Sequence, residues 1–175
     1  AEITEISNRT TLSDQGKFYF YSSHPAIEPA DTFNKVCTRR EATAAILGCY
    51  TNNRVYVYNV TDKRLDGIKE VTAAHEMLHA AYQRLSGGEQ ARVNGLLEKE
   101  YQRLKTDKDL AERMAYYDKN EPGEKYNELH SIIATEYSTT DHELETYYAR
   151  YFSNRQAVVK LHSAYAGVFA KLASQ

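Results

Sequence analysis

Residues 66–88 read DGIKEVTAAHEMLHAAYQRLSGG, and they give the clearest structural pattern in the chain. Apolar residues recur in it with the 3.6-residue period of a helix, at Ile68, Val71, Leu78 and Tyr82. The pattern ends at Ser86–Gly88, where two glycines favour a helix stop. We therefore expect one helix here, and it carries the segment TAAHEMLHAA.

Two short apolar runs precede this helix. AAILGCY (44–50) and RVYVYNV (54–60) flank the turn-forming residues TNN (51–53). In the second run, valines alternate with tyrosines, and β-branched and aromatic residues are typical of strands. We expect a β-hairpin.

The chain after the motif has a helical pattern. We expect helices over 89–105, 107–118 and 126–138, and a last one that begins at the capping residue Asp141 and runs nearly to the end. The first 36 residues are ambiguous, because KFYFYS (17–22) fits a strand or a short helix capped by Ser13. The expected fold class is α+β and mostly α-helical, with a small sheet, an active-site helix and a helical C-terminal half.

Length and charge narrow the class of protein. The chain has 175 residues, so we expect residues 1–175 to form a single domain. Its 22 Lys and Arg and 24 Asp and Glu are interleaved, with a formal net charge of −2, which argues against a nucleic-acid partner. No uncharged stretch approaches the ~20 apolar residues of a transmembrane helix, and the acidic start AEITEIS is unlike a signal peptide. We expect no membrane-spanning segment, while the oligomeric state stays open.

The chain contains two cysteines, Cys37 and Cys49, and they do not form a Cys-x-x-Cys pair. One interpretation is two small buried apolar side chains. The other is a disulfide that closes this short loop and implies an oxidising compartment. The possibility of a disulfide slightly favours an extracytoplasmic or secreted protein over a cytoplasmic one.

The chemistry is concentrated in TAAHEMLHAA. His75 and His79 are four residues apart, so on a helix both can point a nitrogen at one metal ion. Glu76 lies beside them and can take a proton from a water and later deliver it to a leaving amine. A zinc ion would lower the pKa of that water towards ~7 and polarise the scissile carbonyl. A helix face rich in alanine and leucine would rarely hold these polar groups unless something such as a metal satisfied them.

The motif and its flanks resemble the zincin metallopeptidases. That family prefers uncharged residues within and around the motif and often Val or Thr three residues before the first histidine, a position that Thr72 fills here. The resemblance implies zinc-dependent peptide-bond hydrolysis, with one Zn²⁺ per chain, His75 and His79 as ligands and Glu76 as general base.

A catalytic zinc normally has three protein ligands and one open position. The metzincin extension is absent after His79, so the third ligand lies further on. Asn127–Glu128 resembles the Asn-Glu pair of the gluzincins, which implies Glu128 as the ligand, and Ser131 also fits. The family's Asp that orients the first histidine is replaced by Ile132.

Two other residues compete with Glu128 for the third position. Glu136 is the main alternative, because the helical period places it in the middle of an apolar face where a carboxylate needs a partner. It could instead accept a hydrogen bond from a ligand histidine. His130 is the remaining candidate. We assign no residue that stabilises the transition state, because the many tyrosines after residue 136 fit a core as well.

The expected partner is a peptide or protein substrate. In gluzincins, an extended peptide pairs with a strand above the active-site helix, and RVYVYNV could serve. The alternative function is a catalytically inactive zinc-binding interaction module, although Glu76 would then have no use. A helical interaction protein without metal is a third hypothesis.

Overall fold

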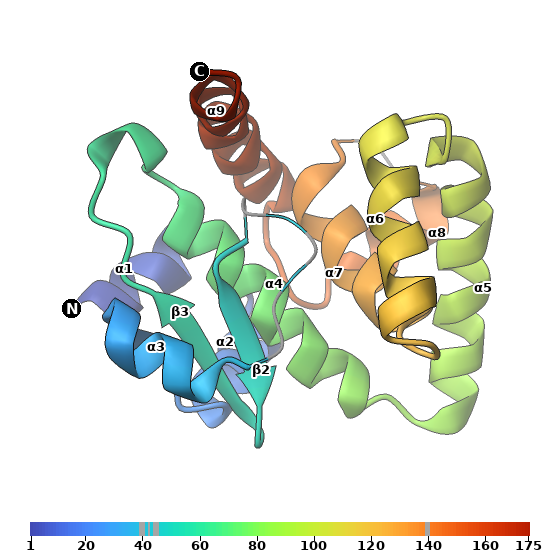
Figure 1. The fold of residues 1–175 in the computed structure, drawn as a ribbon. Helices are drawn as coiled ribbons and strands as arrows, with labels where there is room; N and C mark the ends of the chain where they lie inside the picture. The colour runs from blue at the N-terminus through green and yellow to red at the C-terminus, as the bar shows by residue number, and fades with distance from the viewer. Residues whose placement is uncertain (39–40, 42, 44–45, 139–140) are drawn as a thin grey trace.

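A computed structural model describes residues 1–38, 41, 43, 46–138 and 141–175. It confirms the mostly helical α+β class, with one small sheet. Figure 1 shows the sheet on one side of helix α4 (Ile68–Gln83) and, on the other, helices α5 (Gly87–Leu104), α6 (Lys108–Asn120), α7 (Lys125–Glu136) and α8 (His142–Tyr148). Helix α4 packs against strands β2 (Gly48–Thr51) and β3 (Arg54–Tyr58) and against helices α7 and α9 (Arg155–Ala173), so elements from the whole chain meet on it.

Helix α4 is a central, buried helix rather than an amphipathic surface one. Of its 16 residues, only Lys69 and Gln83 are not buried. A helix that is apolar on most sides must be covered on most sides, and its alanines allow neighbours to approach closely. The backbone enters α4 through Gly67, whose φ of 98° lies in the left-handed region that favours glycine.

The sheet has the order β1–β3–β2, with β1 (Ala26–Glu28) parallel and β2 (Gly48–Thr51) antiparallel to β3 (Arg54–Tyr58). The predicted hairpin is confirmed for β2 and β3, and its first two residues, 44–45, lie outside the described residues. Asn52 and Asn53 have φ of 52° and 61°, as in the two-residue type I′ turns that suit the twist of a hairpin. Strand β2 is therefore an edge of the sheet.

Gly48 lies where β2 crosses α4. A Cβ atom at this position would lie 2.5 Å from Thr72 Cγ2 and 2.7 Å from the Tyr56 carbonyl oxygen. Only glycine allows the strand to come this close to the helix. The Thr72 hydroxyl also accepts a hydrogen bond of 3.3 Å from the Leu47 N–H. The edge strand is thereby placed directly over the motif helix.

The ambiguous N-terminal region contains helices α1 (Glu2–Arg9), α2 (Asp14–Ser22) and α3 (Ala30–Val36). Of the two interpretations of KFYFYS, the structure has the helix. The Ser13 side chain caps it by accepting a hydrogen bond from the Gly16 N–H.

The expected helices after the motif are present as α5 (Gly87–Leu104), α6 (Lys108–Asn120) and α7 (Lys125–Glu136). The role predicted for the glycine pair was wrong. Helix α4 ends at Gln83, and Gly87–Gly88 open α5, with Ser86 as the cap that accepts from the Glu89 N–H. Serine followed three residues later by glutamate is a helix-start pattern, and it outweighs the glycines.

The single long last helix that we predicted was also wrong. Asp141 does cap a helix, but α8 (His142–Tyr148) ends early and α9 (Arg155–Ala173) begins separately. Between them, Phe152 forms an isolated bridge with Leu12, and the Ser153 N–H donates to the Thr11 carbonyl at 2.8 Å. These bonds to a distant segment replace the hydrogen bonds of a continuous helix.

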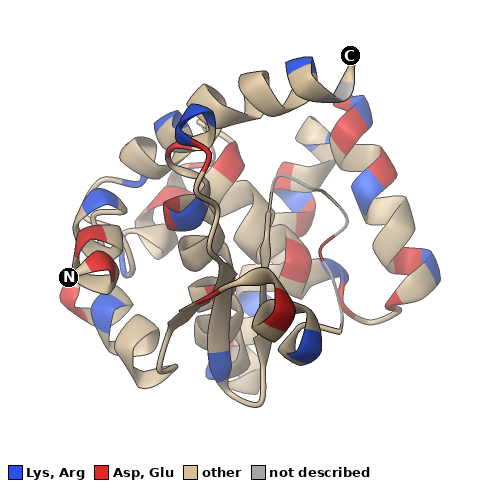
Figure 2. Cartoon of the chain, turned by 60° about the vertical axis from the view of Figure 1, so that its left-hand side comes forward, with Lys and Arg blue, Asp and Glu red and all other residues tan. Residues whose placement is uncertain are grey.

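Charges of both signs are spread over the surface elements in Figure 2, in agreement with their interleaving in the sequence. Among the described helices, none is long and apolar enough to cross a membrane.

Cys37 and Cys49 form a disulfide, which selects one of the two interpretations of the cysteines. The bond links the end of α3 to β2, and both cysteines pack with the buried Phe33 in a small apolar cluster of their own. The disulfide therefore anchors both ends of the connection between α3 and β2, which contains Glu41.

Removing this disulfide should destabilise the protein. The crosslinked residues are 12 apart in sequence, and a loop of this size corresponds to about 3 kcal/mol in the chain-entropy model. We expect a Cys37→Ala/Cys49→Ala variant to lose about that much unfolding free energy in urea titrations. A reductant should lower the wild-type midpoint and leave the variant's unchanged; a wild-type midpoint insensitive to complete reduction would contradict the prediction.

Candidate metal centre

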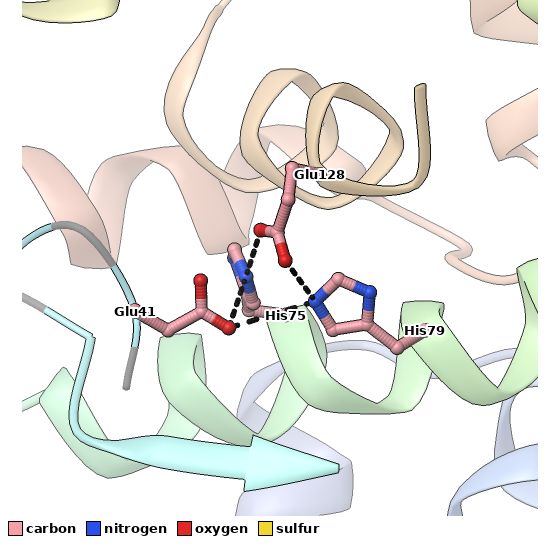
Figure 3. A group of neighbouring side chains, drawn as sticks. All are labelled: Glu41, His75, His79 and Glu128. Atoms are coloured by element: carbon pink, nitrogen blue, oxygen red, sulfur yellow. Dashed lines mark ion pairs between the residues drawn. The ribbon is translucent and has the colours of Figure 1, made fainter. Parts of the chain in front are cut away.

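His75 and His79 lie one turn apart on α4, with ring centroids 5.0 Å apart. Both are buried, and in Figure 3 their rings converge on one region between α4 and α7. The spacing predicted from the motif is thus present in the structure.

Glu128, near the start of α7, reaches both histidines. Its Oε1 lies 3.4 Å from Nε2 of His79, and its Oε2 lies 3.5 Å from Nε2 of His75. The carboxylate therefore spans the two imidazole nitrogens that face the same space (Figure 3).

Helix α7 is held against α4 by both apolar and polar contacts. Leu129, Ile132 and Ile133 are fully buried in the main core. The Ser131 hydroxyl donates a 2.8 Å hydrogen bond to the His75 carbonyl oxygen, which fixes the register between the helices at the first histidine. Ser131, noted in the sequence for its resemblance to the family pattern, thus has a structural role.

Asn127 orients His79. Its Oδ1 lies 2.8 Å from Nδ1 of His79, and its Nδ2 donates to Glu124 at 2.9 Å. Because the amide nitrogen donates to Glu124, the oxygen faces the imidazole and accepts its Nδ1–H. In the neutral imidazole, Nε2 would then carry the lone pair that a metal needs. His75 has no such partner: its Nδ1 makes no hydrogen bond within the described part of the chain.

Glu41 joins the cluster, although no sequence pattern predicted it. It lies in the connection between α3 and β2, with its Oε1 3.2 Å from Nε2 of His75 and 3.6 Å from Nε2 of His79. Its side chain is only 8% exposed. No helical or strand spacing links Glu41 to the motif, so the sequence carried no signal for it beyond its acidic type.

Glu76 is buried beside these donors. Its Oε1 lies 3.8 Å from Nε2 of His79, and neither oxygen has a hydrogen-bond partner among the described residues. An unpaired carboxylate in the interior is costly unless a charged or polar group compensates it. Burial and the nearby Glu41 raise the pKa of Glu76 well above its usual range.

The electrostatic field of the cluster attracts positive charge. Burial lowers the pKa of His79, but Glu128 and Glu41 raise it, so that it lies at about 10. Burial also opposes protonation of His75, yet Glu41 and Glu128 raise its pKa. Burial disfavours the ionised form of Glu41 as well, but the two histidines lower its pKa. A field that favours a proton on both imidazoles would also favour a divalent cation between them.

Glu41, His75, His79 and Glu128 form a group that could hold a metal ion, with donor atoms all within 4.8 Å of one another. This use fits the buried atoms that have no hydrogen bond to any residue that the structure describes, which include Nδ1 and Nε2 of His75 and Oε2 of Glu128. Two imidazoles and two carboxylates are a donor set that suits zinc and other divalent transition metals.

The two competing third-ligand candidates lie elsewhere. Glu136 accepts two hydrogen bonds from Arg113, at 2.7 and 3.0 Å, and faces His162 at 3.3 Å. Burial opposes its ionisation, but Arg113 lowers its pKa. The carboxylate at that position does need a partner, as the helical period predicted, and the partner is an arginine.

His130 belongs to a cluster of aromatic side chains. Its Nε2 lies 2.7 Å from the Tyr147 hydroxyl, and the Tyr148 hydroxyl donates to its carbonyl oxygen at 2.9 Å. Burial and the nearby His79 lower its pKa to about 3. The structure therefore brings Glu128 to the histidines and places Glu136 and His130 in other interactions; which of them binds a metal stays a prediction.

A pocket of about 230 Å³ opens onto the cluster. Strand β2 contributes Cys49, Tyr50 and Thr51 to its wall, and the residues that line it also include His79. The described lining residues contain no lysine or arginine, whereas five glutamates line the pocket: Glu41, Glu76, Glu121, Glu124 and Glu128. The pocket thus connects the donors to solvent beside the edge strand.

The chain matches no protein-family model, no curated protein and no solved structure. The assignment of a function therefore depends on the site itself.

Replacing Glu128 and Glu136 separately should distinguish a metal ligand from an ion-pair partner. We expect Glu128→Gln to lower bound metal well below that of the wild type, whereas Glu136→Gln should keep it. Glu136→Gln should instead lower the unfolding free energy by about 3–5 kcal/mol, because the buried Arg113 would lose its buried carboxylate and keep only the exposed Asp109, at 3.6 Å, as an ion-pair partner. Metal content by elemental analysis and urea unfolding measure the two effects, and metal loss in Glu136→Gln alone would reverse the assignment.

Asn127 offers a second test. Asn127→Ala should weaken metal binding about 10–100-fold, the usual effect of removing the partner that orients a ligand histidine. Competition with a chromophoric chelator measures the affinity. Asn120→Ala, on α6, removes only an exposed side chain bonded to its own helix and should bind metal like the wild type; equal affinity in both variants would show that Asn127 does not orient His79.

Proposed function

We propose that this protein is a zinc-dependent metallopeptidase in which Glu76 acts as general base. The observation that carries the proposal is the convergence of His75, His79 and Glu128 on one buried region, next to the Glu76 carboxylate, which has no hydrogen-bond partner among the described residues. Buried ionisable groups without partners are costly, so their concentration beside a pocket points to a functional site.

His75, His79 and Glu128 would hold the zinc ion, and Asn127 would keep His79 in the required tautomer. Zinc supplies Lewis acidity towards a carbonyl and lowers the pKa of a water at the site. Beside the positive charge of a zinc ion Glu76 would be ionised, and its Oε1, 3.8 Å from the imidazole of His79, could then accept the proton of that water and pass it to the leaving amine.

A peptide substrate fits the surroundings of the site. Strand β2 is an edge of the sheet, and its residues Tyr50 and Thr51 line the pocket. An extended peptide could add to this edge by main-chain hydrogen bonds, and its scissile bond would then lie next to the histidines. Gly48 supports this geometry, because it allows β2 to lie against the motif helix.

The alternative is a catalytically inactive zinc-binding module. Glu41 favours it, because with Glu41 the site contains four protein donors, as in closed structural zinc sites. Glu76 favours the peptidase, since a closed site has no task for a buried carboxylate outside the donor set.

A Glu76→Gln variant separates these functions. We expect it to retain one zinc per chain while peptide hydrolysis falls by about 10²–10⁴-fold, the usual contribution of a general base. Cleavage of a quenched fluorescent peptide library and elemental analysis provide the two measurements.

The matched control is Glu112→Gln, which neutralises an exposed carboxylate on α6 and should leave both values unchanged. Hydrolysis by Glu76→Gln at the wild-type rate would refute the mechanism. Stoichiometric zinc without hydrolysis in the wild type and in both variants would favour the inactive module, unless the wild-type site is closed by one of its own residues.

A further inference from the structure

Glu41 differs from the other donors in the structural element to which it belongs. The histidines and Glu128 stand on α4 and α7, whereas Glu41 belongs to the connection between α3 and β2. Figure 3 shows its carboxylate approaching the two imidazoles from another side than that of Glu128. One of its oxygens, Oε1, faces both Nε2 atoms, at 3.2 and 3.6 Å.

The other oxygen of Glu41 is held by a tyrosine. Oε2 accepts a hydrogen bond of 2.6 Å from the hydroxyl of Tyr117, which is buried on α6. A carboxylate that binds a metal usually has such a second partner, which fixes its orientation. Tyr117 thus points Oε1 of Glu41 at the histidines.

On a metal ion held by His75, His79 and Glu128, Oε1 of Glu41 would take the coordination position that catalysis requires. A catalytic zinc has three protein ligands and one position for water or substrate, and a fourth protein ligand closes it. Glu41 also lines the pocket together with Tyr50 and Thr51 of the edge strand. A peptide laid along β2 would therefore enter space beside the Glu41 carboxylate.

We propose that Glu41 is a fourth, displaceable metal ligand and that the structure shows a closed, latent form of the site. Water or the substrate carbonyl gains access when the Glu41 side chain withdraws and gives up its bond to Tyr117. This inference rests on the proposed metal site at His75, His79 and Glu128, but it does not require that the substrate be a peptide.

Binding of a small metal chelator tests the proposal without relying on activity. Acetohydroxamate needs free coordination positions, so its apparent affinity falls in proportion to the fraction of open sites. We expect zinc-loaded Glu41→Ala to retain one zinc per chain and to bind acetohydroxamate about tenfold more tightly than the wild type in calorimetric titrations. Tyr117→Phe keeps the carboxylate and removes its hydrogen bond, so its affinity should lie between the two.

Two controls keep the result interpretable. Asp118→Asn removes an exposed negative charge next to Tyr117 on α6 and should bind acetohydroxamate like the wild type. Glu41→Gln provides a near-isosteric replacement if Glu41→Ala does not fold, and it should also bind more tightly.

Equal acetohydroxamate affinity in the wild type and the Glu41 variants would overturn the proposal, because Glu41 would then not occupy a coordination position. Loss of zinc from the folded Glu41 variants would also overturn it, since Glu41 would be an indispensable ligand of a closed site. Tighter acetohydroxamate binding without any peptide hydrolysis would support displaceable ligation by Glu41 and refute only the peptidase function.

Discussion

The ionisable side chains buried on α4 determine which elements have to pack around this helix. His75, Glu76 and His79 lie on a helix that is covered on nearly all sides, so bulk water solvates them only weakly. Their charges must be compensated by neighbouring elements or by a cation. Helix α7 brings Glu128 and Asn127 to the histidines, and the connection before β2 brings Glu41. The elements that pack around α4 thus also bring together the charged groups of the site.

Local sequence patterns predicted much of the fold because the interactions behind them are local. The alternation of valine and tyrosine in β3 and the turn at Asn52–Asn53 define the hairpin without help from distant residues. The prediction of one long last helix was wrong because distant residues interrupt it. Phe152 pairs with Leu12, and the Ser153 N–H donates to the Thr11 carbonyl. The helix start at Ser86 was readable from its spacing to Glu89, but the two glycines obscured it.

In the site, too, local patterns predicted some residues, whereas others depend on contacts between distant segments. Helical periodicity places His75, Glu76 and His79 together, and the resemblance to a family pattern singled out Glu128, which the structure brings to them. The orienting bond from Asn127 to His79 required the register between α4 and α7. Glu41 required the path of an irregular connection, anchored by the disulfide and by Tyr117, and no periodicity describes such a path. Contacts between distant segments therefore account for what the sequence alone did not reveal.

The contact between residues near 11 and residues near 153 has a consequence for folding. The Thr11 hydroxyl donates to the Asn154 carbonyl at 2.9 Å across a separation of 143 residues. Closing so large a loop early costs chain entropy before many native contacts reward it, and folding rates fall as contacts become less local. During synthesis, α1 and α2 leave the ribosome before the segment around residue 153, so this junction cannot form until that segment has also emerged. The junction should therefore close late in folding, whereas the contacts of α1 and α2 with the motif helix do not have to wait for it.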